Sequence, residues 1–146
     1  MGLKQKIAVA SDHAGFEAKE SIRKLLEKEG FSVRDFGPAD AASVDYTGYA
    51  HLVADAVSAG EASFGILICG TGIGMSIAAN KVPGIRAAVC TNEFMAEATR
   101  AHNDANILCL GARVNSAEEI QKIARKFLSV KFEGGRHSER ISKYRL

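Results

Sequence analysis

The sequence has few cysteines, little net charge and no long apolar run, and each shortage argues against a class of protein. The three cysteines, Cys69, Cys90 and Cys109, are an odd number without CxxC spacing, which disfavours a disulfide framework and a cysteine zinc site. A formal net charge of +2 is too small for a general nucleic-acid surface. No apolar run approaches the ~20 residues that a membrane-spanning helix requires. We therefore expect neither a nucleic-acid nor a membrane partner.

Targeting signals are also missing from the first residues, MGLKQK. They lack the apolar segment of a signal peptide, and Lys6 stands where N-myristoylation requires Ser or Thr. We therefore expect a cytoplasmic protein. The 146 residues are enough for one domain with its own core, and no linker or repeat divides them. A single domain over residues 1–146 is predicted, with a basic tail at 133–146.

Short apolar segments alternate with helical patterns along the chain. Segments that are apolar on both faces are typical of buried parallel strands, and this alternation predicts a three-layer α/β/α sandwich around a five-stranded parallel sheet. Gly30 is expected to follow the end of the first helix, and Ser116 to cap the start of the last large one. The expected strands are 6–10, 31–36, 64–69, 85–90 and 106–110, and the expected helices are 15–29, 47–59, 73–81, 92–103 and 116–129.

Polar clusters follow most of the expected strands. Ligands of open α/β sheets bind beyond the carboxyl ends of the strands, so converging clusters there predict a site. Taken alone, Asp12 and His13 would be explained by a helix cap and an exposed imidazole. Within this set of loops, Asp12 is expected to bond sugar hydroxyls and His13 to lie near a phosphate. Tyr46 is either a substrate contact or an aromatic at the rim of the core. Arg113 follows the last strand.

The segment 69–74, CGTGIG, is the most informative of these loops. Gly70, Gly72 and Gly74 let the backbone come close to a ligand and point successive N–H groups at an anion. The loop is not a dinucleotide fingerprint, because Ile77 stands where a further glycine is needed, and no Gly-Lys-Ser/Thr follows for a Walker loop. An oxyanion hole for an enediolate fits it better.

Cys69 stands where the third expected strand meets the following helix, a position that favours a reactive thiolate. Cys90 and Cys109 lie inside apolar runs and are expected to be buried packing residues. Thr71 is expected to cap the helix, to contact substrate, or both.

His102 and Asn103 end the fourth expected helix and precede the last strand, so they should lie at the opposite, amino edge of the sheet. They form either an ordinary helix end, with Asn103 as a left-handed cap, or part of another subunit's site in a dimer. In the tail, Arg136 and Arg140 are either a frayed basic terminus or a phosphate clamp. No set of His, Cys, Asp and Glu shows metal-ligand spacing, so no metal is expected.

With these residues in view, the chain resembles the type B ribose-5-phosphate isomerase family, which includes galactose-6-phosphate and allose-6-phosphate isomerases. The resemblance covers nearly the whole chain. It rests on SDHAGF at its start, on Asp45-Tyr46, and on three longer strings: GILICGTGIGMSIAANKVPGIRAA, ATRAHNDANILCLGAR and FEGGRHSERI.

The resemblance implies a Rossmann-like fold, a dimer or tetramer with two-chain sites, and neither metal nor organic cofactor. It implies that Cys69 is the proton-transfer base, since Met75 occupies the position where other members carry a glutamate. Thr71 and the amides of 70–74 would hold the enediolate, while Asp12 contacts the sugar. Ring opening falls to His102 with Asn103 beside it. The phosphate would be held by His13, Arg113, Arg136 and Arg140, and His137 matches a family position whose role stays open.

We therefore predict an isomerase that interconverts ribose 5-phosphate and ribulose 5-phosphate through a cis-enediolate, as a homodimer or homotetramer. The alternatives are an isomerase of allose 6-phosphate, galactose 6-phosphate or another small aldose phosphate, and a non-catalytic sugar-phosphate-binding module. Cys69 and His102 weigh against the module, which needs no base. Some sugar-6-phosphate relatives work as paired unlike subunits, a possibility that one sequence leaves open.

Overall fold

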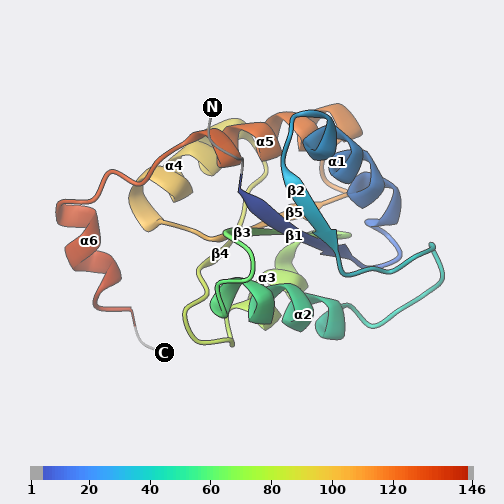
Figure 1. Ribbon diagram of the computed structural model, residues 1–146, viewed down its shortest axis with the longest axis horizontal. Coiled ribbons are helices and arrows are strands. Elements are labelled where there is room, and N and C mark those ends of the chain that lie inside the picture. Colours follow the sequence, from blue (N-terminus) through green and yellow to red (C-terminus); the bar gives the residue numbers. More distant parts are fainter. Residues whose placement is uncertain (1–4, 145–146) are drawn as a thin grey trace.

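In the computed structural model, which describes residues 5–144, a parallel sheet forms the centre of the molecule (Figure 1). Its five strands are arranged in the order β2-β1-β3-β5-β4. In the register of the two central strands Cys69 pairs with Gly111, so both strands end at one edge. The bounds are β1 Lys6–Ser11, β2 Ser32–Asp35, β3 Phe64–Cys69, β4 Ala87–Val89 and β5 Ile107–Gly111.

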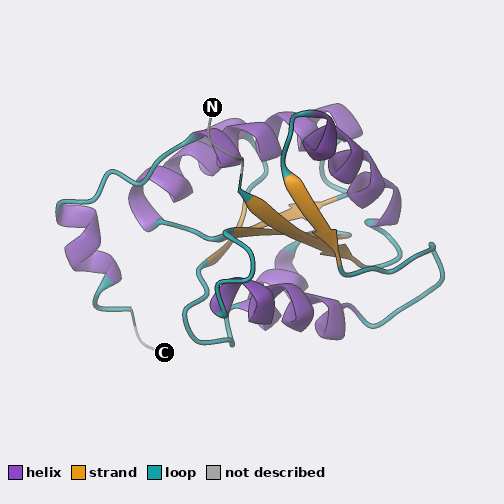
Figure 2. Cartoon of the chain, viewed as in Figure 1, coloured by secondary structure: helices purple, strands orange, loops and turns teal. Residues whose placement is uncertain are grey.

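Helices cover both faces of this sheet. Figure 2 shows α1, α4 and α5 above it and α2 and α3 below it, while the short α6 stands apart near the end of α4. The three-layer α/β/α class predicted from the sequence is confirmed. The bounds are α1 Phe16–Lys28, α2 Tyr46–Ser58, α3 Ile73–Ala79, α4 Glu93–Asn103, α5 Ala117–Ser129 and α6 Arg136–Ile141.

Two apolar cores, one on each face of the sheet, hold the layers together. Ile66 and Leu108 point to the α1, α4 and α5 side, where Phe127 is fully buried. Leu67 and Cys69 point to the α2 and α3 side. Burying a leucine, isoleucine or phenylalanine side chain stabilises the fold by roughly 1.5–3 kcal/mol. Because side chains alternate between the two cores, the central strands are apolar at nearly every position, as the sequence showed.

The helix ends agree with the sequence at two places and differ at a third. Ser116 and Glu119 form a reciprocal capping box at the start of α5, and Gly30 follows α1 with a φ of 93°. Asn103, which the interpretation as an ordinary helix end would make the left-handed cap, is instead the last residue of α4. Asp104 takes that conformation, with a φ of 47°. Its carboxylate accepts a hydrogen bond from Arg100 at 2.8 Å, which holds the residue in place.

The edge strands are shorter than predicted. β2 covers Ser32–Asp35 instead of 31–36, and β4 covers Ala87–Val89 instead of 85–90. Just before β4, the N–H of Arg86 donates to the side-chain oxygen of Asn106 at 2.8 Å. An edge strand has a ladder on one side only, so a side-chain acceptor can end it early. Within residues 5–144, no helix has the length and apolar character needed to cross a membrane.

Candidate active site

The loops that follow β3 and β5 are joined at the carboxyl edge of the sheet. The N–H of Ala112 donates to the carbonyl of Cys69 at 2.9 Å, and the N–H of Arg113 donates to the carbonyl of Gly70 at 3.0 Å. These bonds continue the strand pairing past the sheet. They fix the segment 69–74 against the start of the next loop.

Cys69 faces the first turn of this glycine loop. Its Sγ accepts a hydrogen bond from the N–H of Gly72 at 3.1 Å, and the residue is 6% exposed. Gly72 has a φ of 83°, and a Cβ there would lie 3.1 Å from backbone atoms of Leu110. Only glycine combines this conformation with this close approach. The loop therefore needs Gly72 in order to aim an N–H at the sulfur.

Thr71 stands just before Gly72, the N-cap of the following helix, and its side chain contacts the first residue of that helix. Its Oγ1 accepts from the N–H of Ile73 at 3.2 Å, while the residue stays exposed. The first hydrogen bond inside α3 runs from the N–H of Ser76 to Gly72, so the N–H groups of Gly74 and Met75 precede the helical ladder. The Met75 side chain is fully buried in the core below the sheet. The helix thus brings an apolar side chain, and no carboxylate, to that position.

Two further side chains approach the loop because its glycines leave room. A Cβ on Gly70 would lie 3.3 Å from Nη1 of Arg113. A Cβ on Gly74 would lie 2.8 Å from the ring of Tyr46. Arg113 and Tyr46, which come from different loops, therefore lie against the same short segment.

Asp12 and His13 continue this edge from β1. The N–H of Asp12 donates to the carbonyl of Ile68 at 3.1 Å, and its Oδ1 accepts from the N–H of Gly15 at 3.0 Å. Asp12 is 8% exposed, so it is a buried carboxylate next to the end of β3. Nδ1 of His13 accepts from the N–H of Val44 at 3.4 Å, which ties it to the loop before α2. The structure thus brings together the predicted residues of the first, second, third and fifth strands.

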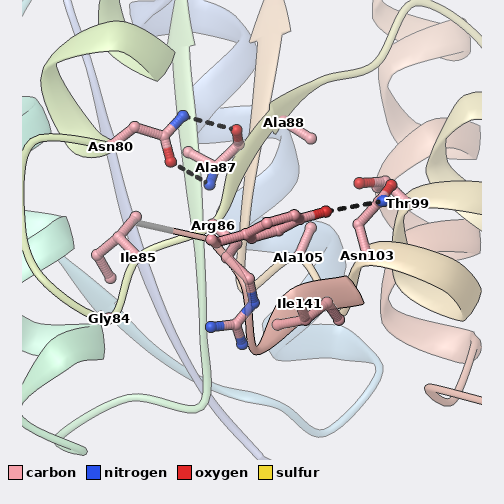
Figure 3. Close-up of a pocket in the computed structure, with 11 residues that line it drawn as sticks. Asn80, Gly84, Ile85, Arg86, Ala87, Ala88, Thr99, Asn103, Ala105 and Ile141 are labelled. Atoms are coloured by element: carbon pink, nitrogen blue, oxygen red, sulfur yellow. Dashed lines mark hydrogen bonds between the residues drawn. The ribbon is translucent and has the colours of Figure 1, made fainter. Parts of the chain in front are cut away.

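His102 and Asn103 lie at the opposite edge, as predicted. Nδ2 of Asn103 donates to the hydroxyl of Tyr144 at 3.5 Å beside a groove of about 520 Å³ (Figure 3). None of the groove-lining residues belongs to the segment 69–74. Nε of Arg86, the charged residue that lines the groove, already donates a hydrogen bond to the carbonyl of Asp104 at 2.9 Å. We therefore locate the candidate chemistry at the glycine loop rather than in this groove.

His102 belongs to a small polar cluster with Glu133 and His137. The rings of the two histidines stack, with centroids 4.4 Å apart and an interplanar angle of 18°. Their Nε2 atoms lie 3.7 and 3.6 Å from Oε1 of Glu133. Burial lowers the pKa of His137, and the neighbouring His102 and Arg136 lower it further. Spacing along the sequence did not reveal this group, whose three potential ligand atoms lie within 4.8 Å of one another.

The two tail arginines lie on α6, beside this cluster. Arg136 is its first residue and Arg140 lies four positions later; both side chains are exposed. Within residues 5–144 neither forms a salt bridge with a carboxylate. They are therefore available to an anion.

Comparisons with known proteins agree on one family. Residues 7–144 match the family described as Ribose/Galactose Isomerase. The chain belongs to this family. It is 47% identical to ribose-5-phosphate isomerase B of Escherichia coli over 137 residues, which cover 94% of this chain and 92% of that protein.

Solved structures give the same result. The structure resembles ribose-5-phosphate isomerase B of Clostridium thermocellum with a TM-score of 0.94 and 53% identity, covering 94% of this chain and 93% of that one. It also resembles the Mycoplasma genitalium enzyme with bound ribulose 5-phosphate, with a TM-score of 0.91 and 46% identity, covering 94% of this chain and 92% of that one. The predicted family, its Rossmann-like fold and the isomerase class are confirmed.

The sequence reasoning missed Glu133 and Asp104. Glu133 stands four residues before His137, but Gly134 and Gly135 separate them and gave no sign of a helix. In the structure both glycines have positive φ values, 72° and 58°, and they turn the chain so that the two side chains meet. The spacing of four residues between Glu133 and His137 was the available signal of their proximity. It could not be interpreted without knowing that the two glycines form a turn.

Proposed function

We propose that this chain interconverts ribose 5-phosphate and ribulose 5-phosphate, with Cys69 as the base that moves a proton between carbons 1 and 2. The observation that carries the proposal is the hydrogen bond from the N–H of Gly72 to Sγ of Cys69. A donor aimed at sulfur compensates the charge that the sulfur carries as a thiolate. A buried thiol that only filled space would need no such donor.

The sugar carbons would lie over the glycine loop. The Cys69 thiolate takes the proton from carbon 2, and the electrons move to the aldehyde oxygen, giving a cis-enediolate. The sulfur then returns the proton to carbon 1, while the hydroxyl proton of oxygen 2 moves to oxygen 1. The N–H groups ahead of the α3 ladder and the exposed Thr71 hydroxyl support stabilisation of the enediolate. Asp12, buried beside the loop, would accept a hydrogen bond from a sugar hydroxyl.

The phosphate would bind to arginines that form no salt bridge with a carboxylate within residues 5–144. Arg113 lies against the loop, and Arg136 and Arg140 are exposed on α6 without a salt bridge within residues 5–144. Guanidinium groups match phosphate oxygens in pairs. His13, tied to the loop before α2, would complete the phosphate site.

The site would be shared by two copies of the chain. Cys69 ends β3 at the carboxyl edge, whereas His102 precedes β5 at the amino edge. A strand of five or six residues spans ~17–20 Å, too far for an imidazole of the same subunit. His102, Asn103 and the α6 arginines of the partner subunit would therefore face Cys69, with His102 opening the furanose ring. This arrangement supports a homodimer, or a homotetramer built from such dimers, in which the basic tail reaches the partner's site.

The substrate can be tested directly. Purified protein should convert ribose 5-phosphate with a kcat/KM at least tenfold above those for allose 6-phosphate and galactose 6-phosphate. The Cys69→Ala variant, measured on the best substrate, separates a catalysed reaction from a contaminating activity. If the protein prefers a six-carbon sugar phosphate, the proposed substrate is wrong and the proposed mechanism still stands. No turnover of any of the three by folded, dimeric protein would overturn the proposal.

A further inference from the structure

The cluster of His102, Glu133 and His137 has the composition and spacing of a metal site. Within residues 5–144 it is the one group of three potential ligand residues that lie close enough together to share an ion. The Nε2 atoms of the histidines lie 3.7 and 3.6 Å from Oε1 of Glu133. These distances are longer than those of hydrogen bonds, so the three side chains lie close together without being hydrogen-bonded through these atoms.

The spacing fits an ion of zinc size. Zinc–nitrogen and zinc–oxygen bonds of ~2.0–2.2 Å put neighbouring tetrahedral ligand atoms roughly 3.3–3.6 Å apart. The two separations from Glu133 need to shrink by only a few tenths of an ångström to reach those values, and the two histidine ligand atoms lie within 4.8 Å of each other. Two imidazoles and one carboxylate suit Zn²⁺, Ni²⁺, Co²⁺ or Cu²⁺, whereas Mg²⁺ and Ca²⁺ prefer sites made of oxygen alone.

The fold holds the three residues in this position. The N–H of Glu133 donates to the carbonyl of Ala101 at 3.0 Å, which fixes the chain beside the end of α4. The positive φ values of Gly134 and Gly135 turn it back, so that His137 enters the first turn of α6. His137 is 8% exposed and stacks on His102. A shared ion would then require the stacked rings to turn, so that both lone pairs point at it.

The local charges act in both directions. Arg136 and Arg140 repel a cation, and the Glu133 carboxylate attracts it. About half of the His102 and Glu133 side chains is exposed, which leaves an approach from solvent. These opposing charges favour binding of intermediate strength rather than a permanently occupied site.

We propose that His102, Glu133 and His137 form an inhibitory binding site for a divalent transition metal. The inhibition rests on the function proposed above, in which the imidazole of His102 takes part in ring opening. A bound ion occupies the lone pair of the ligating nitrogen, so this nitrogen can no longer take up a proton and later release it. Isomerisation should therefore fall as the site fills, by about tenfold at an ion concentration ten times the dissociation constant.

Binding is tested by calorimetry with Zn²⁺ on the full, untagged chain after treatment with a chelator that is then removed. One ion should bind per subunit. Glu133→Gln keeps the shape and removes the anionic ligand, so it should weaken binding by at least ~10-fold, since even residues that only support a ligand contribute 10–100-fold. Glu139→Gln, which removes the same charge from an exposed position on α6, is the matched control and should bind as the unchanged chain does.

A cysteine is the competing zinc ligand, so Cys69→Ser is titrated in parallel and should keep its affinity. With each protein compared with its own metal-free turnover, inhibition of Glu133→Gln by Zn²⁺ should shift to higher concentration, while that of Glu139→Gln should not shift. Unchanged affinity in Glu133→Gln, or loss of binding in Cys69→Ser, would overturn the site. Stoichiometric binding without inhibition would overturn its inhibitory role. If no aldose phosphate is converted, the proposed function fails, and calorimetry still decides whether the metal site exists.

Discussion

The N–H of Gly72 donates to Sγ of Cys69 across 3.1 Å, and this contact distinguishes Cys69 from the other two cysteines. Burial raises the pKa of Cys90 to about 11, and it raises the pKa of Cys109 well above its ordinary range. Both remain protonated at neutral pH. Cys69, at the end of its strand, is the cysteine whose position fits proton transfer.

Cys69→Ala should lower kcat by at least ~10²-fold with little change in KM, as expected for removal of a general base that does not contribute to binding. Steady-state kinetics on ribose 5-phosphate measures both constants. Cys90→Ala is the matched control and should keep kcat within a few-fold. Near-normal turnover of Cys69→Ala would assign the base to another residue.

The conformation of Gly72 gives a prediction for stability. Gly72→Ala forces a side chain into a φ of 83° and against the backbone of Leu110, which should cost about 1–3 kcal/mol of unfolding free energy. Gly48 lies within α2, and a Cβ there would meet nothing within 4 Å. Gly48→Ala should therefore stabilise the protein by about 0.4–1 kcal/mol. Urea denaturation compares the two, and equal effects would contradict the strained position of Gly72.

How far the sequence predicted this structure depended on how locally each feature is determined. β3 was predicted with its observed bounds, because a strand buried on both faces is apolar throughout. The edge strand β4 was predicted too long, since its start depends on a distant acceptor, the side chain of Asn106. The convergence of Asp12, Tyr46 and Arg113 on the glycine loop followed from the topology of parallel sheets. His137 meets Glu133 through a glycine turn that helical or strand periodicity does not predict.

The lowered pKa of His137 predicts a loss of stability in mild acid. Burial and the positive charges of Arg136 and Arg140 oppose its protonation in the folded state, Glu133 favours it, and His102 adds a further positive charge when protonated. Below its ordinary pKa of about 6.5, the unfolded chain binds this proton more readily, so stability falls as the pH drops through the lowered folded value.

The expected result is a steeper fall in unfolding free energy between pH 6.5 and 5 for the unchanged chain than for His137→Gln. Denaturation at several pH values measures the slopes. His51→Gln removes an exposed histidine of α2 and should leave the slope as it is. Parallel curves for all three proteins would contradict the prediction.

Catalysis should not need a metal, because the proposed chemistry uses a thiolate, an imidazole and backbone N–H groups. Protein treated with EDTA is therefore expected to keep its full kcat on ribose 5-phosphate, while micromolar Zn²⁺ lowers it through the histidine cluster. Assays with and without chelator, followed by addition of single divalent ions, check this. Activity lost with EDTA and restored by one ion would show a catalytic metal instead.

The last prediction concerns the shared site. Cys69 and His102 lie at opposite edges of one sheet, so each site would combine Cys69 of one copy with His102 of the partner subunit. Homodimers of Cys69→Ala and of His102→Ala should each be nearly inactive. After subunit exchange, a hybrid dimer has one site with both defects and one site with neither. The mixture should therefore recover about a quarter of the unchanged activity, because half the dimers are hybrids and half the sites in each are intact.

Exchange has to be measured as well as activity. Native mass spectrometry counts the hybrid dimers. Each hybrid contains one Cys69→Ala subunit and one His102→Ala subunit, so its mass differs from that of either parent homodimer. As a control, mixing two different substitutions of Cys69, Ala and Ser, should give hybrids without recovery, since no site then regains a thiol. Recovery in the first mixture alone would support a site built from two chains. If hybrids form in full while activity stays at the level of the parents, either Cys69 and His102 act within one subunit or His102 has only a structural role. Either result would overturn the shared site.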